Sequence, residues 1–73
     1  MINRDYRQIV ANIAQRIKLV RLETPKTQGD VALYLGQSQS YISKIESGKQ
    51  PITAAELKLL ADFCERPIRD FFD

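Results

Sequence analysis

Apolar residues recur at helical spacing along the chain, and turn residues divide them into five segments. The first segment predicts a helix from about residue 4 or 5 to Leu22, with Asn3 as its N-cap. The apolar stripe along this helix consists of Ile9, Ile13 and Ile17. Pro25 prevents the helix from continuing, because proline lacks an amide hydrogen and its ring clashes with the preceding turn.

The segment from about residue 27 to 46 predicts two short helices joined by a glycine turn. Thr27 has the position of an N-cap and Asp30 is the third helical residue, so the two can satisfy backbone amides reciprocally. Gly36 fits the left-handed conformation that ends a helix, and Ser38 caps the next one. The inward faces of the two helices consist of Val31, Ala32, Leu35, Ile42 and Ile45. This spacing is typical of a helix-turn-helix.

Two further helices are predicted after this motif. Thr53 and Glu56 have capping-box spacing at the start of the fourth helix. Its inward face continues as Leu57, Leu60, Ala61 and Cys64. Pro67 suits the first turn of a short fifth helix. We therefore expect an all-α fold, with five helices around one core and a single domain over residues 1–73.

These positions resemble the phage-repressor-like, or Xre, family of helix-turn-helix regulators from about Ile13 to Phe72. The resemblance is carried by Ile13, Ile17 and Arg21, then by TQ..VA..LG.SQSYISKIESGK, and finally by L..LADF...I..FF. It implies a five-helix repressor-like fold that binds double-stranded DNA without a cofactor. The family usually has glycine after its first and fourth helices, whereas this chain has Thr24-Pro25-Lys26 and Glu65-Arg66-Pro67. We expect these two turns to be built differently.

The exposed side of the second motif helix predicts the contacts to DNA bases. A recognition helix enters the major groove with its N-terminal half leading, so Gln39 and Ser40 meet base edges first. Lys44 lies one turn beyond Ser40 on the same face, and the resemblance assigns base contacts to all three positions. Glutamine can pair with adenine, and lysine can reach guanine acceptors or a phosphate. The alternative is that these side chains are ordinary helix surface.

Donors at helix N-termini predict contacts to phosphates, since the free amides and the helix dipole already favour an anion there. The predicted phosphate-contacting residues are Gln28, Ser38, Tyr41, Ser47 and Lys49. Ser38 has helix capping as an equally good role. Arg21 and Glu46 match a pair that is ion-paired in the resembled family, and we expect this pair to position the recognition helix.

Protein contacts are predicted on two surfaces. Leu33 and Tyr34 occupy a part of their helix that is normally polar in the resembled family, and exposed apolar groups can mark an interface. The alternatives are that the phase of this helix is misjudged, or that these are ordinary scattered surface residues. One motif contacts few base pairs, so specific recognition usually requires two copies about 34 Å apart on the duplex, and we expect a homodimer. Family relatives often use the C-terminal region around Ile68, Phe71 and Phe72 for this contact, and the alternative is that these residues pack in the core. The predicted dimer or partner surface therefore consists of Ile68, Phe71, Phe72, Leu33 and Tyr34.

Composition narrows the range of functions. The net charge is +2, with eight Lys/Arg against four Asp/Glu in residues 1–55 and three against five in residues 56–73. With no histidine and one cysteine, Cys64, the chain lacks the common ligands of transition metals and the usual nucleophile–base pairs. We expect no enzyme activity, no metal, no cofactor and no small-molecule ligand. With no signal core and no long apolar run, a cytoplasmic location without membrane contact is expected.

Two functional hypotheses follow. The first is a sequence-specific transcriptional regulator, a repressor that binds a palindromic operator as a homodimer. The alternative is the antitoxin of a toxin–antitoxin pair, which acts mainly by binding its protein partner and secondarily represses its own operon. The small members of the resembled family include phage regulators, restriction-modification controllers and antitoxins, and the residues do not choose among them.

Overall fold

The computed structural model describes residues 5–72, and within this range the chain is entirely helical, with no strand. It contains four α-helices and a short terminal 3-10 helix: α1 (Tyr6–Glu23), α2 (Gln28–Leu35), α3 (Gln39–Glu46), α4 (Ala54–Cys64) and η1 (Ile68–Phe71). The prediction of an all-α fold is confirmed. The fifth predicted helix is a single 3-10 turn, so residues 5–72 contain four α-helices rather than five. Asn3, the expected first cap, lies outside the described residues.

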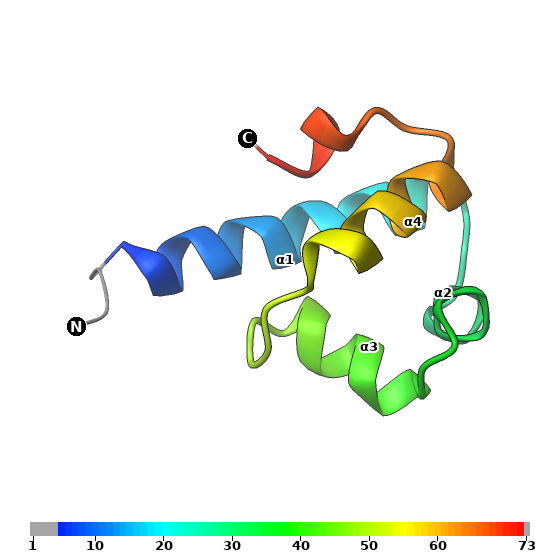
Figure 1. Cartoon of the computed structure of the whole chain (residues 1–73), viewed down its shortest axis with the longest axis horizontal. Helices are drawn as coiled ribbons and strands as arrows, with labels where there is room; N and C mark the ends of the chain where they lie inside the picture. Colours follow the sequence, from blue (N-terminus) through cyan, green and yellow to red (C-terminus); the bar gives the residue numbers. More distant parts are fainter. Residues whose placement is uncertain (1–4, 73) are drawn as a thin grey trace.

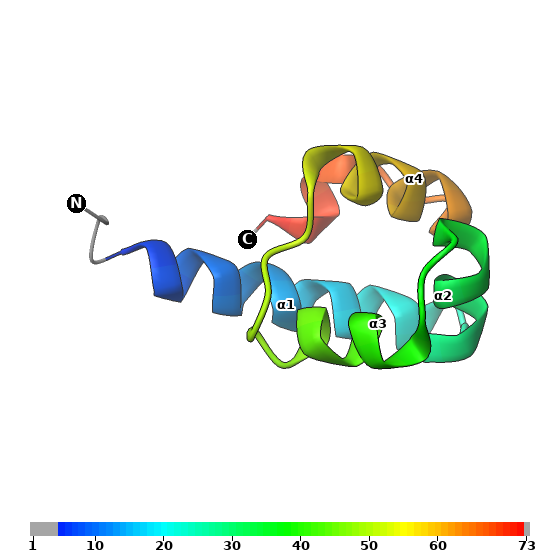
Figure 2. The same cartoon turned by 60° about the horizontal axis from the view of Figure 1, so that its bottom comes forward.

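Helix α1 runs along the molecule, and its N-terminal part projects beyond the other helices (Figure 1). Helices α3 and η1 both pack on α1, but they lie on opposite sides of it. Helix α2 packs against α3 and α4, and Figure 2 shows α2 and α3 from the side on which they are exposed. The predicted helix-turn-helix therefore forms one side of the molecule, and the C-terminal end lies on the other.

The core is formed mainly by the residues that the sequence pattern predicted for the inward faces of the helices. Cys64 is buried among apolar side chains, as expected for a small hydrophobic residue. The buried cluster consists of Ile17, Val20, Val31, Ala32, Ile42, Ile45, Leu57, Leu60, Ala61, Cys64 and Phe71. The predicted stripe on α1 is only partly buried, because Ile13 is half-buried and Ile9 is exposed on the projecting part of the helix.

The predicted caps are present. The Thr27 hydroxyl accepts a hydrogen bond from the Asp30 amide at 3.0 Å, and the Asp30 carboxylate accepts one from the Thr27 amide at 2.9 Å. Thr53 and Glu56 form the same reciprocal box at the start of α4. Gly36 ends α2 with a φ of 69°, in the left-handed region where glycine carries no steric cost.

The two turns that lack glycine are built by other means. Glu65 itself takes the left-handed conformation after α4, with a φ of 55°, although a side chain there costs energy that glycine avoids. After α1, the Thr24 hydroxyl lies 3.0 Å from the carbonyl oxygens of Val20 and Arg21. The Lys26 amide donates to the Arg21 carbonyl at 2.9 Å. Both turns thus satisfy helix-end carbonyl groups without glycine.

Phe71 is part of the core and not of the surface. Its exposed fraction is 0%, whereas Ile68 and Phe72 are 42% and 49% exposed. The Nε of Arg16 donates to the Asp70 carbonyl at 2.9 Å, which ties η1 to α1, and η1 also packs on α4. Of the two roles left open for Phe71, core packing is the one that the structure shows, and its placement on a dimer or partner surface was wrong, because this packing turns its ring inward.

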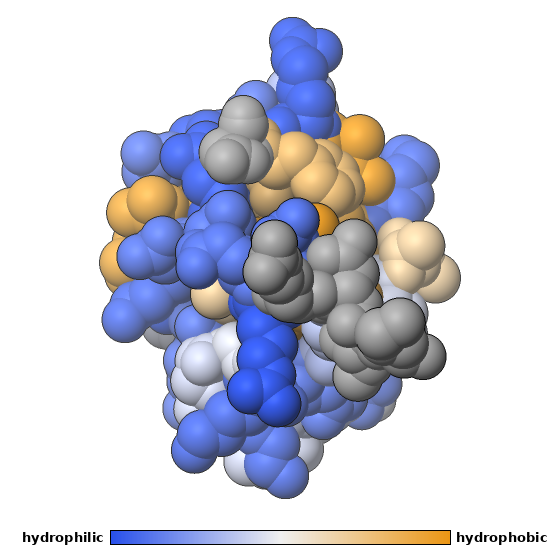
Figure 3. Space-filling view, turned by 90° about the vertical axis from the view of Figure 1, so that its left-hand side faces the viewer, coloured by the Kyte–Doolittle hydropathy of each residue, from blue (hydrophilic) through white to orange (hydrophobic). Residues whose placement is uncertain are grey.

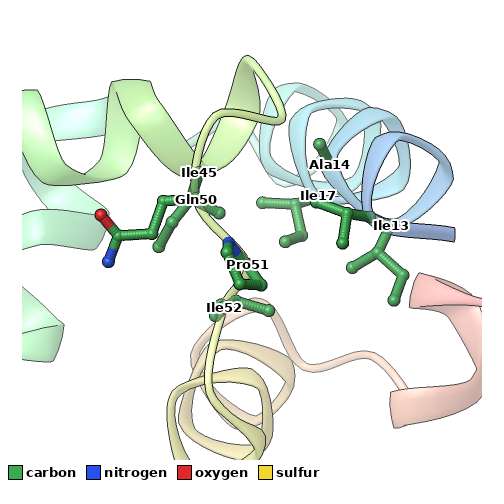
Figure 4. A pocket seen from close by; sticks show the side chains of 8 residues that line it. Ile13, Ala14, Ile17, Ile45, Gln50, Pro51 and Ile52 are labelled. Atoms are coloured by element: carbon green, nitrogen blue, oxygen red, sulfur yellow. The ribbon is translucent and has the colours of Figure 1, made fainter. Parts of the chain in front are cut away.

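A small apolar hollow lies between α1 and the segment after α3 (Figure 4). Its volume is about 40 Å³, far below the roughly 300–1,000 Å³ typical of small-molecule sites. The hollow is lined by Val10, Ile13, Ala14, Ile17, Ile45, Gln50, Pro51 and Ile52. Gln50 is the one polar lining residue, and its amide points away from the labelled apolar side chains, so we interpret the hollow as imperfect packing.

Replacing Phe71 by alanine should lower the free energy of unfolding by about 3–5 kcal/mol, because it leaves a cavity where a fully buried ring was. Replacing Phe72 by alanine should change it by about 1 kcal/mol or less, since half of that ring is already in water. Urea unfolding followed by circular dichroism compares the two. Equal losses would contradict the placement of Phe71 in the core.

Candidate nucleic-acid interface

The outward face of α3 carries a row of polar side chains. Ile42 and Ile45 are buried against the core, and this orientation turns the other side of the helix to solvent. The row consists of Gln39, Ser40, Ser43 and Lys44, which line one open surface depression together with Gln28 of α2. Ser43 was not among the predicted contacts. Its position three residues after Ser40 and four after Gln39 was the signal that could have found it.

Arg21 and Glu46 form the expected ion pair. The guanidinium meets the carboxylate through two hydrogen bonds, Nε to Oε2 at 2.6 Å and Nη2 to Oε1 at 3.0 Å. The two side chains are only 9% and 4% exposed. The hydrogen bond from Arg21 to Glu46 raises the pKa of the arginine above its ordinary value, although burial acts in the opposite direction. The pair joins α1 to the last residue of α3.

This pair is the centre of a larger hydrogen-bonded cluster. The Nη1 of Arg21 donates to the Lys26 carbonyl at 2.9 Å. The Nε2 of Gln28 donates to Glu46 Oε1 at 3.1 Å, so the first residue of α2 is tied to the last residue of α3. A side-chain amide has two hydrogens, and the second hydrogen of Gln28 is still a donor for the predicted phosphate contact.

The serines at the two ends of α3 contribute to its caps. The Ser38 hydroxyl accepts from the Tyr41 amide at 3.2 Å and lies 3.2 Å from the Ser40 hydroxyl. The Ser47 hydroxyl donates to the Lys44 carbonyl at 3.1 Å. Lys49 is exposed beyond that end. The capping role predicted for Ser38 is confirmed, and the phosphate contacts of Ser38, Ser47 and Lys49 stay predictions.

Tyr41 differs from its predicted role. Its hydroxyl lies 2.9 Å and 3.0 Å from the two carboxylate oxygens of Glu56. Burial raises the pKa of Tyr41, and the hydrogen bond to Glu56 raises it further, so the hydroxyl is protonated at neutral pH. It has a single proton to donate. In this geometry Tyr41 therefore donates to Glu56, and a contact to a phosphate would require that hydrogen bond to break.

Leu33 and Tyr34, one of the predicted protein surfaces, line a different surface depression from the polar row of α3. Leu33 is 84% exposed, while the ring of Tyr34 stacks on Phe63 with centroids 4.3 Å apart. The Nζ of Lys26 lies 4.5 Å from the centroid of the same Phe63 ring. Figure 3 views the end of the molecule from which α1 projects, and its hydrophobic surface gathers in the upper part, toward η1. The lower part, toward α3, is mostly hydrophilic.

Residues 17–71 match a family model described as "Helix-turn-helix". Among solved structures, the restriction-modification controller protein C.AhdI from Aeromonas hydrophila has a TM-score of 0.78 at 22% identity, over 86% of this chain and 96% of that one. At this identity the likeness establishes the fold alone. A point mutant of the restriction-modification controller protein C.Esp1396I has a TM-score of 0.75 at 31% identity, over 88% of this chain and 85% of that one.

An HTH_3 family transcriptional regulator from Vibrio cholerae has a TM-score of 0.79 at 26% identity, and the match covers 90% of this chain but only 37% of that protein. None of the curated proteins compared with the chain matches it. Within residues 5–72, no helix is long and apolar enough to cross a membrane, and no group of side chains is arranged to hold a metal ion.

Replacing Glu46 by alanine should lower the free energy of unfolding by about 3–5 kcal/mol, since it leaves the buried guanidinium of Arg21 without its partner. Glu23 provides a matched control, because its ion pair with Arg66 is largely exposed to solvent. Its replacement by alanine should change stability little. Thermal and urea unfolding of both variants would reveal the difference. Similar small effects would show that the buried pair adds nothing to stability.

Proposed function

Because the chain belongs to the Xre-type helix-turn-helix family and is a DNA-binding regulator rather than an enzyme, we propose that it represses transcription by binding a palindromic operator as a homodimer. The observation that carries this proposal is the row of exposed polar side chains on α3, a helix whose opposite face is buried. Repression would follow from occlusion of a promoter in the cytoplasm, where the DNA is.

In this proposal the first turn of α3 reads the bases. Gln39 and Ser40 are the first two residues of the helix, and both are exposed. A recognition helix presents its N-terminal residues to the base edges of the major groove. Lys44 lies one turn further along the same face and would contact a guanine or a phosphate. Each good base pairing is worth about 1–3 kcal/mol of discrimination.

Phosphate contacts would hold this helix in register. Gln28 and Ser38 stand at the starts of α2 and α3, where free backbone amides favour an anion. Ser47 and Lys49 follow the end of α3. Such contacts carry no sequence information, but they fix the orientation of the protein on the duplex.

The similar controllers suggest the genes under control. C.AhdI and C.Esp1396I are named as restriction-modification controller proteins, and the present chain spans 96% and 85% of them. The match to C.Esp1396I, at 31% identity over 85% of that protein, supports control of restriction-modification genes as the biological role of this chain, and the match to C.AhdI adds the fold. Of the two controllers, C.Esp1396I is the more similar in sequence, at 31% identity.

One observation favours a second candidate, an antitoxin that binds a protein partner. Among residues 5–72, Leu33 is the most exposed of the large apolar side chains, at 84%, and it lies beside the stacked rings of Tyr34 and Phe63. An apolar group this open to water is suited to a protein contact. In that case binding to a toxin would be the main activity, and repression of the operon would be secondary.

Selection of sites from a random duplex library, at low and near-physiological salt, tests the first proposal. The expected result is enrichment of a two-fold symmetric site, and its loss in the Gln39→Ala, Ser40→Ala double variant, because base contacts are removed while phosphate contacts remain. Binding that enriches no sequence and disappears as salt is raised would be phosphate attraction alone. That result would favour the protein-partner hypothesis.

The homodimer is tested by mass measurement in solution. We expect the Ile68→Ser, Phe72→Ser double variant to be a folded monomer, because both side chains are exposed and neither belongs to the core. The Leu33→Ser, Tyr34→Ser double variant is the matched comparison and should remain dimeric. The reverse pattern would place the dimer contact on α2, and a monomeric wild type would contradict the homodimer altogether.

A further inference from the structure

The Glu56 carboxylate gathers hydrogen bonds from three separate parts of the chain. It accepts from the Thr53 amide at 3.1 Å, from the Tyr41 hydroxyl at 2.9 and 3.0 Å, and from Gln37 Nε2 at 3.1 Å. Thr53 caps α4, Tyr41 belongs to α3, and Gln37 lies in the turn that joins α2 to α3. One side chain of α4 thus bonds both the recognition helix and the turn before it.

Helix capping does not account for this arrangement. A capping box needs only the reciprocal bonds between its two members, here Thr53 and Glu56. The other capping box of the chain is a built-in comparison. Its carboxylate, Asp30, accepts from the Thr27 amide, and among the described residues it has no hydrogen bond to another helix. The bonds from Tyr41 and Gln37 to Glu56 therefore go beyond what the cap requires.

The electrostatics keep the carboxylate in the form that accepts hydrogen bonds. Burial raises the pKa of Glu56, but the hydrogen bonds from Thr53, Tyr41 and Gln37 lower it, and the pKa lies below its ordinary value. Glu56 is therefore ionised at neutral pH, and both oxygens accept. Hydrogen bonds to a charged acceptor are roughly twice as strong as neutral ones, so this is an effective attachment point.

The two carboxylates hold opposite ends of α3. Glu46, the last residue of the helix, is bonded to Arg21 and Gln28. At the other end, Tyr41 is the third residue of the helix and is bonded to Glu56. Of the side chains proposed to read bases, Lys44 lies between Tyr41 and Glu46 in the chain. Gln39 and Ser40 lie between Tyr41 and Gln37, which is also bonded to Glu56. A surface that reads bases must be held within about 0.5 Å of its productive position by supporting contacts. The hydrogen bonds of Glu46 and Glu56 are supporting contacts of this kind.

We propose that Glu56 is a positioning residue for sequence recognition, which sets the orientation of the N-terminal half of α3 on DNA through Tyr41 and Gln37. It touches no base itself. This inference rests on the proposed function, since it concerns how Gln39 and Ser40 are aimed at the bases. It gives Tyr41 an indirect part in specificity, in place of the direct phosphate contact predicted from the sequence.

The test measures selectivity for sequence, expressed as the dissociation constant for random duplexes divided by the dissociation constant for the selected duplex. Removing the carboxylate in Glu56→Ala should lower this ratio about tenfold or more, the equivalent of losing one good base pairing. Glu56→Gln keeps an oxygen that accepts from Tyr41 and should retain most of the ratio. Tyr41→Phe should lower the ratio as well, and the Tyr41→Phe, Glu56→Ala double variant should be no worse than Glu56→Ala alone, because both remove the same bond.

Thr53→Ala is the matched control for helix capping. It removes the hydroxyl that accepts from the Glu56 amide, but it leaves the Tyr41 and Gln37 bonds in place. This variant should lose stability, as expected for a lost N-cap, and keep the wild-type ratio. A loss of ratio in Thr53→Ala as large as in Glu56→Ala would mean that capping alone is responsible.

The outcomes separate this inference from the proposed function. A wild-type protein that selects no site would overturn the proposed function and this inference with it. A selective wild type with an unchanged ratio in both Glu56→Ala and Tyr41→Phe would overturn only the role of Glu56. If Glu56→Ala does not fold, Tyr41→Phe decides alone, because it removes a single hydroxyl from a half-buried ring.

Discussion

The ion pair between Arg21 and Glu46 is the interaction on which the placement of α3, the helix proposed to read DNA, depends. It joins residues 25 positions apart, and its two side chains are almost completely buried. A buried charge is costly unless it is paired and hydrogen-bonded, so the arrangement tolerates little displacement of either partner. Because Gln28 bonds the same carboxylate and the Lys26 carbonyl accepts from the same guanidinium, α1, the following turn, α2 and α3 meet at this point. The recognition helix is oriented relative to the whole domain through its last residue.

The carboxylate of Glu56 fixes the orientation of α3 at its other end, the N-terminal one. Glu56 belongs to α4 and bonds Tyr41 and Gln37, so both ends of α3 are held by acidic side chains that make hydrogen bonds to other elements. The polar row lies on the solvent side of the same helix, and the exposed apolar residues Ile68 and Phe72 lie on the other side of α1. This separation is compatible with the proposed homodimer, in which a copy of the chain would bind at the C-terminal side while α3 remains free for the groove.

Features formed by residues close together in the chain were predicted correctly from the sequence. The Thr27–Asp30 and Thr53–Glu56 boxes, the left-handed Gly36 and the inward isoleucines of α3 all follow from spacings of three or four residues. The ion pair of Arg21 and Glu46 was expected only from the family resemblance, because nothing in the local pattern links these positions. The left-handed Glu65 was not predicted, because it lacks the usual glycine. For Phe71 the sequence left core packing and a surface role both open, because the choice depends on how η1 packs.

The sequence by itself determined the four α-helices, the caps of α2, α3 and α4, and Gln39, Ser40 and Lys44 of the polar row, since each depends on neighbours within one or two turns. Only the tertiary structure decided that Phe71 faces inward, that Tyr41 donates to Glu56, and that Arg16 ties η1 to α1. These contacts join residues 15 to 54 positions apart. Helical periodicity indicates which side of a helix is apolar. A hydrogen bond between two helices depends on the angle and distance at which they cross, and these are decided only when all the buried faces pack together.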